Sequence, residues 1–159
     1  MTSTLFTYNK AKVIQALRYH FMSRPEIKIM MVLVNIFAIA SAALFFFKKV
    51  SPLAFLISSV LWFFLMILFW FILPQIIYKQ SATFKDSFCA VLGREQFAIE
   101  NDRGHKGWDW SSFSFWMESP HFFHLYFNPR SFFIIPKDAF EGDEEHEARK
   151  IFTAMIAKK

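Results

Sequence analysis

Two apolar stretches decide the fold of this chain: IMMVLVNIFAIASAALFFF at residues 29–47 and VSPLAFLISSVLWFFLMILFWFIL at residues 50–73. Only Lys48 and Lys49 separate them. At about 1.5 Å per helical residue the first stretch extends roughly 28 Å, close to the ~30 Å hydrocarbon core of a bilayer. The second stretch is longer and can span a bilayer with some tilt. We therefore predict a hairpin of two transmembrane helices within residues 29–77.

Soluble core helices and signal peptides also contain apolar runs, but both fit this sequence poorly. A helix in the core of a soluble protein keeps one polar face, and Leu61 to Leu73 has none. A cleavable signal peptide has a short apolar region near the N-terminus, whereas this run starts late and a second span follows at once. The sequence therefore predicts an integral membrane protein from which no segment is removed.

The distribution of charge predicts the topology. The net charge is +5, and residues 1–49 carry seven basic side chains against one acidic side chain, Glu26. Five basic residues before the first span, together with Lys79 and Lys85 after the second, outnumber the two in the turn. By the positive-inside rule both termini are predicted to be cytoplasmic. The basic excess is then topogenic, so no nucleic-acid partner is expected, and the single Cys89 agrees with a reducing compartment.

The leader, residues 1–28, contains a basic amphipathic helix between Tyr8 and Met22, where the apolar side chains follow helical spacing. Such a helix can lie on an anionic membrane surface. It can equally pack against a folded domain with its charges in water. The sequence leaves both locations open.

After the hairpin, residues 79–159 change to a period of two, which is typical of half-buried strands. We predict five antiparallel strands in meander order: Phe84 to Leu92, Gln96 to Glu100, Lys106 to Glu118, His121 to Phe127 and Arg130 to Pro136. A helix follows, with Asp143 as its N-cap and acidic residues in its first turn. The predicted class is α+β, with one curved sheet plugged by the C-terminal helix.

Three motifs in this region resemble a known family. They are GWDWSSF at residues 107–113, FFHLY at residues 122–126 and FFIIPKDAF at residues 132–140. Together they are similar to the YcxB-like family of bacterial membrane proteins, which places two spans ahead of a small domain resembling part of a pleckstrin-homology (PH) fold. The resemblance covers about residues 80–158. It implies a PH-like domain and a bacterial inner-membrane location, and it brings no catalytic residues.

The residues themselves give little sign of catalysis. His121 and His124 are three apart, but on a strand they point to opposite faces and no cysteine or acidic cluster joins them. Asp109 has no paired base, Cys89 has no nearby histidine in the sequence, and the chain has only four glycines and no phosphate loop. We therefore expect no enzyme activity, metal or cofactor.

The aromatic surplus indicates association instead. Both faces of the predicted strands carry apolar side chains. One face can form the core, and the second must be covered by a helix of the chain, the lipid interface or a protein partner. The candidate interaction surface consists of Phe122, Tyr126, Trp116 and Lys137. On the first span, Ala38 and Ala42 form a small-xxx-small pair, a candidate contact between helices.

Two functions remain. In the first, the protein is a non-enzymatic membrane protein whose cytosolic domain is an interaction module. In the second, it is an immunity protein that neutralises a membrane-targeted bacterial toxin. The expected partners are the bilayer and either a membrane or toxin protein or a second copy of the chain.

Overall fold

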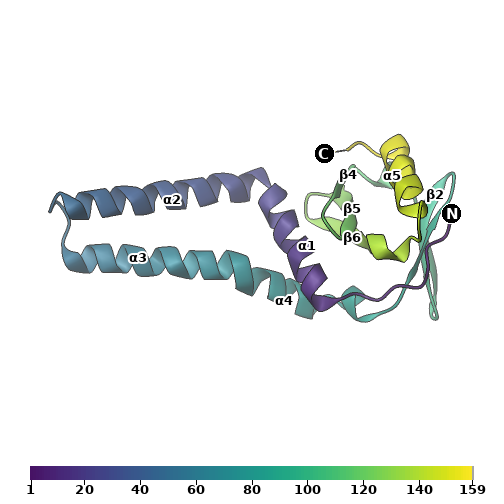
Figure 1. The fold of residues 1–159 in the computed structure, drawn as a ribbon, viewed down its shortest axis with the longest axis horizontal. Helices are drawn as coiled ribbons and strands as arrows, with labels where there is room; N and C mark the ends of the chain where they lie inside the picture. Colours follow the sequence, from purple (N-terminus) through teal and green to yellow (C-terminus); the bar gives the residue numbers. More distant parts are fainter. Residues whose placement is uncertain (159) are drawn as a thin grey trace. The chain divides into compact units, whose positions relative to one another are not determined.

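The computed structural model describes residues 1–158 and has an α+β fold: helices in the N-terminal part, two antiparallel three-stranded sheets and a C-terminal helix (Figure 1). The chain divides into two compact units. The helical unit comprises residues 17–80, and the sheet unit comprises residues 1–16 together with the chain from Ser81 onward. Helix α1, Lys10–Ser23, contributes its first half to the sheet unit and its second half to the helical unit.

The helical unit is built from α2 (Pro25–Phe46), α3 (Pro52–Ile67), a π-helical segment (Leu68–Ile72) and α4 (Leu73–Gln80). Helix α1 stops just before Arg24, which is extended at φ −80° and ψ 126°, because a residue that precedes proline avoids the α region. At the far turn, the Ser51 hydroxyl accepts a hydrogen bond from the Ala54 backbone N–H at 3.3 Å and caps α3.

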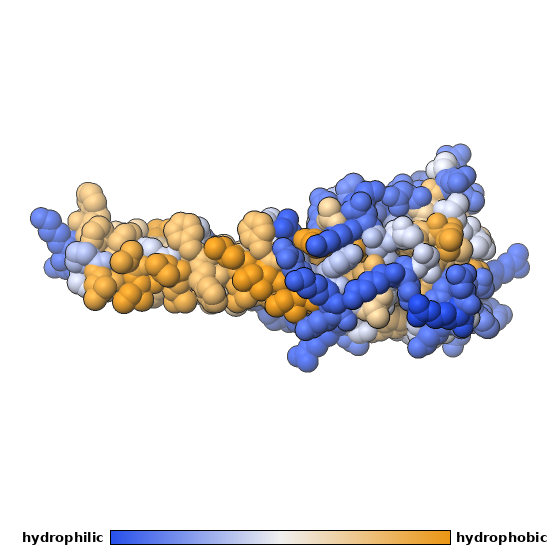
Figure 2. Space-filling model, turned by 90° about the horizontal axis from the view of Figure 1, so that it is seen from below, coloured by the Kyte–Doolittle hydropathy of each residue, from blue (hydrophilic) through white to orange (hydrophobic). Residues whose placement is uncertain are grey.

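Two helices of this unit are long and apolar enough to cross a membrane: Pro25–Phe46 with 22 residues and Pro52–Gln80 with 29. None of the residues in their most apolar windows is buried inside the protein. Figure 2 shows the resulting apolar surface along the hairpin. The two helices are joined by a 2.7 Å hydrogen bond between the Ser41 and Ser58 hydroxyls and by a longer contact, 3.4 Å, from Trp62 Nε1 to Asn35 Oδ1.

The sheet unit holds six strands in two sheets rather than five in one meander. The first sheet has the order β1 (Cys89–Leu92), β2 (Gln96–Asn101), β3 (Gly104–Asp109), and the second has the order β4 (Phe115–Glu118), β5 (Phe122–Asn128), β6 (Ser131–Pro136). The predicted strand from Lys106 to Glu118 is wrong. A 3-10 turn at Trp110–Ser112 interrupts it, closed by the Phe113 N–H on the Trp110 carbonyl, and carries the chain between the two sheets.

Both ends of the described chain extend the sheets. The N-terminal residues run antiparallel to β1: the Ser3 N–H donates to the Ala90 carbonyl, and Phe6 and Phe88 exchange two backbone hydrogen bonds. Near the other end, Trp116 of β4 forms a parallel bridge with Lys158. The outer edges of β1 and β4 are therefore covered by segments that the sequence pattern did not identify as strands.

Helix α5, Glu144–Met155, packs on one face of the second sheet. Its Phe152 is fully buried, with ring centroids 5.2 Å from Phe123, 5.8 Å from Trp116 and 6.2 Å from Trp110. Asp143 occupies the predicted N-cap position, but its side chain makes no capping hydrogen bond. The predicted C-terminal helix is therefore observed, but it packs on the second of two sheets and does not plug one curved sheet.

The leader covers the opposite face of β5. The Tyr8 ring stacks on Phe122 at 6.5 Å, and its hydroxyl donates to the Ile134 carbonyl at 2.9 Å. Burial raises the pKa of this hydroxyl far above its ordinary value. Lys12 forms an ion pair with Asp138 at 2.7 Å, and Val13 is fully buried. Of the two locations left open for the leader helix, its first half takes the one against the folded domain.

Candidate functional site at the base of the helical hairpin

A proline disturbs the second long helix at the end of the hairpin that lies away from the α2–α3 turn, which we call the base. Pro74 is buried and has no N–H, so it cannot donate to the carbonyl of Trp70, four residues earlier. The π-helical segment Leu68–Ile72 ends two residues before Pro74. Such segments occur where the regular ladder of backbone hydrogen bonds is broken, often at functional sites.

Arg18 supplies the missing donor. Its Nε donates to the Trp70 carbonyl at 2.8 Å, although the two residues are 52 positions apart. The guanidinium carbon also lies 5.4 Å from the ring centroid of Trp70 and 5.2 Å from that of Phe71, within the range of cation–π attraction. One side chain thus satisfies an orphaned backbone carbonyl and is held in place by two aromatic rings.

The register of the hairpin locates this cluster with respect to the apolar stretch. The contacts Ser41 with Ser58 and Asn35 with Trp62 place Trp70 near the level of Lys28, just before the apolar stretch that begins at Ile29. Tryptophan at the end of an apolar span is typical of the boundary between hydrocarbon and headgroups. The Arg18 guanidinium is held at the level of Trp70 by its hydrogen bond to the Trp70 carbonyl.

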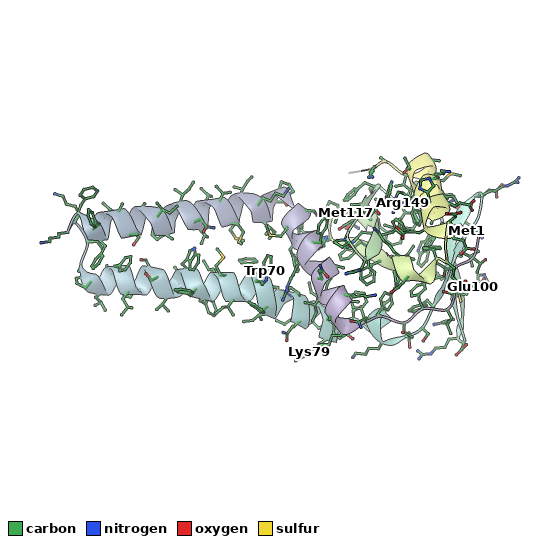
Figure 3. The ribbon with its side chains drawn as sticks, viewed as in Figure 1. Met1, Trp70, Lys79, Glu100, Met117 and Arg149 are labelled. Atoms are coloured by element: carbon green, nitrogen blue, oxygen red, sulfur yellow. The ribbon has the colours of Figure 1, made fainter. Side chains whose placement is uncertain are left out.

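A small hollow lies beside the cluster on the same helix. It has a volume of about 180 Å³ and is lined by Phe71, Ile72, Gln75, Ile76 and Lys79. Phe71 is the residue whose ring lies under the guanidinium of Arg18. Figure 3 labels Trp70 and Lys79, which both lie at the base of the hairpin. The hollow therefore has an apolar floor with basic side chains near it.

The predicted interaction surface does not lie on the outside of the sheet unit. Phe122 and Tyr126 are each 1% exposed and Trp116 is 0% exposed. The reason is that the leader covers the Phe122 face of β5, while α5 covers the Trp116 face. The expectation of an accessible aromatic surface is therefore corrected: these side chains belong to the core.

Lys137, the fourth residue of that predicted surface, belongs to a network of ion pairs. Its Nζ contacts Glu118 at 2.5 Å, and Arg149 of α5 binds Glu118 through Nε and Nη2, the shortest contact being 2.8 Å. Arg149 also contacts Glu145. The hydrogen bond from Arg149, with further help from Lys137, lowers the pKa of Glu118 to about 2 against the cost of burial. The network ties α5 to β4 and engages Lys137, which was predicted to belong to the interaction surface.

The two alanines of the predicted helix contact differ in exposure. Ala38 is half-buried, as is Ser41, which contacts α3, whereas Ala42 is exposed. Ala38 is thus half-buried like Ser41, one turn away on the same helix, whereas Ala42 is accessible from outside.

The polar residues considered for chemistry lie apart from one another. His124 is buried on β5 with its Nε2 2.9 Å from the Ser119 hydroxyl, while His121 is exposed. Cys89 is a half-buried free thiol and Asp109 is exposed at the end of β3. Within residues 1–158, no group of three His, Cys, Asp or Glu side chains is arranged to hold a metal ion.

One strand edge of the sheet unit is open. Strand β3 pairs with β2 through the register Ile99 to Lys106, and in the part of the chain that the structure describes no segment pairs with its other edge. Residues 104–107 are all exposed. Gly104 has φ +141°, a backbone conformation that side-chain-bearing residues rarely adopt. An open strand edge presents backbone donors and acceptors that another chain can use.

Residues 92–152 match the family of YcxB-like proteins. This finding confirms the resemblance predicted from the sequence motifs. The YcxB-like segment begins at the last residue of β1 and ends at Phe152 in α5, so it contains β2 to β6 and most of the final helix. The searches of curated proteins and of solved structures found no match.

Sequence reasoning missed the cluster of Arg18, Trp70 and Pro74. A local signal was present, since a proline four residues after a tryptophan in a long apolar helix leaves that carbonyl without its usual donor. The sequence could not predict which side chain replaces the missing donor, because Arg18 lies on a different helix from the carbonyl that it binds.

Proposed function

We propose that this chain is a non-enzymatic, multi-pass protein of the bacterial inner membrane whose YcxB-like segment is a cytosolic interaction module. One observation carries the proposal. Apart from Leu5 and Met155, every exposed large apolar side chain among residues 1–158 lies in the helical unit. A soluble protein rarely exposes such a continuous apolar surface, so the hairpin needs an apolar surrounding that the sheet unit does not.

The proposed orientation has both termini in the cytoplasm. It is supported by the seven basic residues that precede the first span or closely follow the second, against two in the α2–α3 turn. In this orientation the base of the hairpin, with Arg18 and Lys79, lies at the inner leaflet. The sheet unit then lies in the cytoplasm, where a cytosolic partner can reach it.

The open edge of β3 is the proposed docking surface of the module. An extended segment of a partner protein can add a strand there through backbone hydrogen bonds, a common mode of peptide recognition. This mode is favoured over aromatic docking because Phe122, Phe123 and Tyr126 of β5 are buried. Lys106, whose Nζ lies 5.3 Å from the Trp108 ring centroid, flanks this edge.

Reporter fusions test the membrane part of the proposal. An alkaline phosphatase fusion after the last residue should be inactive, whereas a fusion in the turn at Lys49 should be active, since this enzyme needs the periplasm. Activity at the C-terminus would overturn the orientation, and recovery of the untagged chain in the soluble fraction would overturn membrane insertion.

Photo-crosslinking in native membranes tests the docking surface. A photoreactive residue at Lys106 on β3 should capture a protein partner, and the same residue at Lys150 on the exposed side of α5 serves as the matched control. Equal crosslinking at both positions, or none at Lys106, would count against docking at the β3 edge.

The immunity function is the alternative proposal, and the hairpin supplies an observation in its favour. An open groove of about 520 Å³ runs between α2 and α3, lined mainly by Leu33, Ile36, Phe37, Leu61, Trp62 and Leu65. An apolar helix of a membrane-inserted toxin can pack in such a groove. Co-expression with a toxin-like reading frame from the gene neighbourhood tests it: protection that is lost on Phe37→Ser would support immunity, and absence of protection would reject it.

A further inference from the structure

We propose that Arg18, Gln75 and Lys79 form a binding site for the headgroup of an anionic phospholipid at the base of the hairpin. This inference rests on the proposed membrane insertion. It adds a specific lipid ligand to that proposal and assigns a role to the hollow beside the π-helical segment.

The guanidinium of Arg18 is held in place beside the hollow by Trp70 and Phe71. Its Nε is fixed on the Trp70 carbonyl at 2.8 Å, and the Trp70 and Phe71 rings lie against it. A guanidinium has five N–H donors, so the four on the terminal nitrogens stay available when Nε is engaged. Within the described residues Arg18 makes no ion pair with a carboxylate. Paired terminal nitrogens match the geometry of a phosphate group.

The hollow provides the remaining parts of the site. Phe71, which lies under Arg18, and Lys79 line the same depression of about 180 Å³, with the Gln75 amide between them in sequence. Residues 71, 75 and 79 are spaced by four, so they share one face of the helix. Ile72 and Ile76 give the depression an apolar floor. Cations and an amide above an apolar floor suit an amphipathic ligand with a phosphate.

The sign of the charge in this unit selects an anionic ligand. Residues 17–80 contain six lysine and arginine side chains and a single acidic residue, Glu26, which lies beside Arg24 at 3.7 Å. Neither Arg18 nor Lys79 has a carboxylate partner in the structure as described. Clusters of basic residues at the cytoplasmic end of a span attract anionic lipids.

A lipid-enrichment experiment tests the site with the full chain. The protein is reconstituted into vesicles of equal amounts of phosphatidylglycerol and phosphatidylcholine, extracted gently in detergent, and its retained lipids are counted by native mass spectrometry. The parent should retain phosphatidylglycerol over phosphatidylcholine several-fold. The double variant Arg18→Gln with Lys79→Gln should lose this preference.

A matched control separates a site from general charge. Lys48→Gln with Lys49→Gln removes the same charge at the opposite end of the hairpin and should leave the preference unchanged. Lys79→Gln alone, which removes no hydrogen bond or ion pair found in the structure, should lower the preference without disturbing the helices. Equal losses in the two double variants, or no loss in Lys79→Gln, would overturn the site.

The outcomes also distinguish this inference from the proposed function. A parent that inserts into vesicles without preferring phosphatidylglycerol would reject the lipid site and leave the membrane module standing. A parent that fails to insert at all would reject both.

Discussion

Phenylalanine takes opposite environments in the two units of the molecule. In the helical unit Phe37 is 64% exposed and Phe63 is 60% exposed, whereas in the sheet unit Phe97 and Phe123 are each 0% exposed. The same side chain therefore serves as surface in one unit and as core in the other. Aromatic content alone therefore does not locate a core. The medium around each unit decides whether an apolar side chain is exposed or buried.

The largest expected effect tests this comparison directly. Phe123→Ala in the sheet unit should cost about 3–5 kcal/mol of unfolding free energy, because Phe123 contacts Trp116, Phe140 and Phe152 in a closed core. Phe63→Ala in the hairpin, the matched control, should change it by about 0.5 kcal/mol or less. Thermal unfolding of the detergent-solubilised chain, followed by tryptophan fluorescence, measures both. Equal losses would mean that the two units do not differ in their surroundings.

The ion-pair network on α5 comes next in expected size. Glu118→Gln should destabilise the sheet unit by about 2 kcal/mol at neutral pH, because it leaves Arg149 and Lys137 partly buried without their shared carboxylate. The exposed Glu147→Gln on the same helix is the control, and it should have little effect.

The pH dependence of the same pair of variants sharpens this prediction. The folded-state pKa of Glu118 is about 2, below its ordinary value of 4.5. The carboxylate therefore contributes stability that is fully present above about pH 4.5 and is lost as the pH falls toward 2. The parent and Glu147→Gln should lose this contribution across the window, and Glu118→Gln should lack that loss. Parallel acid-unfolding curves for all three proteins would show that the network does not stabilise the fold.

A double-mutant cycle tests the base of the hairpin. Arg18→Gln should cost about 1–2 kcal/mol, because the Trp70 carbonyl loses its donor. In a Pro74→Ala background the new N–H at position 74 can take over that carbonyl, so Arg18→Gln should cost less there. Unfolding in mixed detergent micelles gives the four free energies. The same cost in both backgrounds would mean that Arg18 does not replace the donor that Pro74 lacks.

The sequence predicted those parts of the fold that depend on local patterns. The two long apolar helices and the helix after Asp143 were confirmed as elements, because the length and the spacing of apolar runs can be read from neighbouring residues. The break at Trp110–Ser112 was missed, since the alternation of apolar residues continues through the turn. The pairing of the first six residues with β1 was also missed, because their partner lies more than eighty positions away.

The candidate site was less predictable than the fold for a related reason. Phe122 and Tyr126 were expected on a surface because nothing local shows that Tyr8 of the leader stacks on Phe122. The Trp70 carbonyl is an orphan by local rules, but its donor is distant in sequence. Periodicity assigns a residue to a face, and only the tertiary structure says what covers that face.

The smallest effect is expected between the two long helices, where the comparison of the units can be tested on polar groups. The Ser41 and Ser58 hydroxyls lie 2.7 Å apart, yet Ser58 also donates to the Phe55 carbonyl of its own helix. Ser41→Ala should therefore cost only about 0.6 kcal/mol, a typical value for a hydrogen bond between membrane helices. Ser59, whose hydroxyl binds the Phe55 carbonyl of its own helix, is the control, and Ser59→Ala should have a smaller effect. Both are measured by unfolding in mixed micelles. A cost above about 2 kcal/mol for Ser41→Ala would mean that polar contacts rather than close packing hold the hairpin together. The two units would then differ in the kind of interaction that stabilises them as well as in the medium around them.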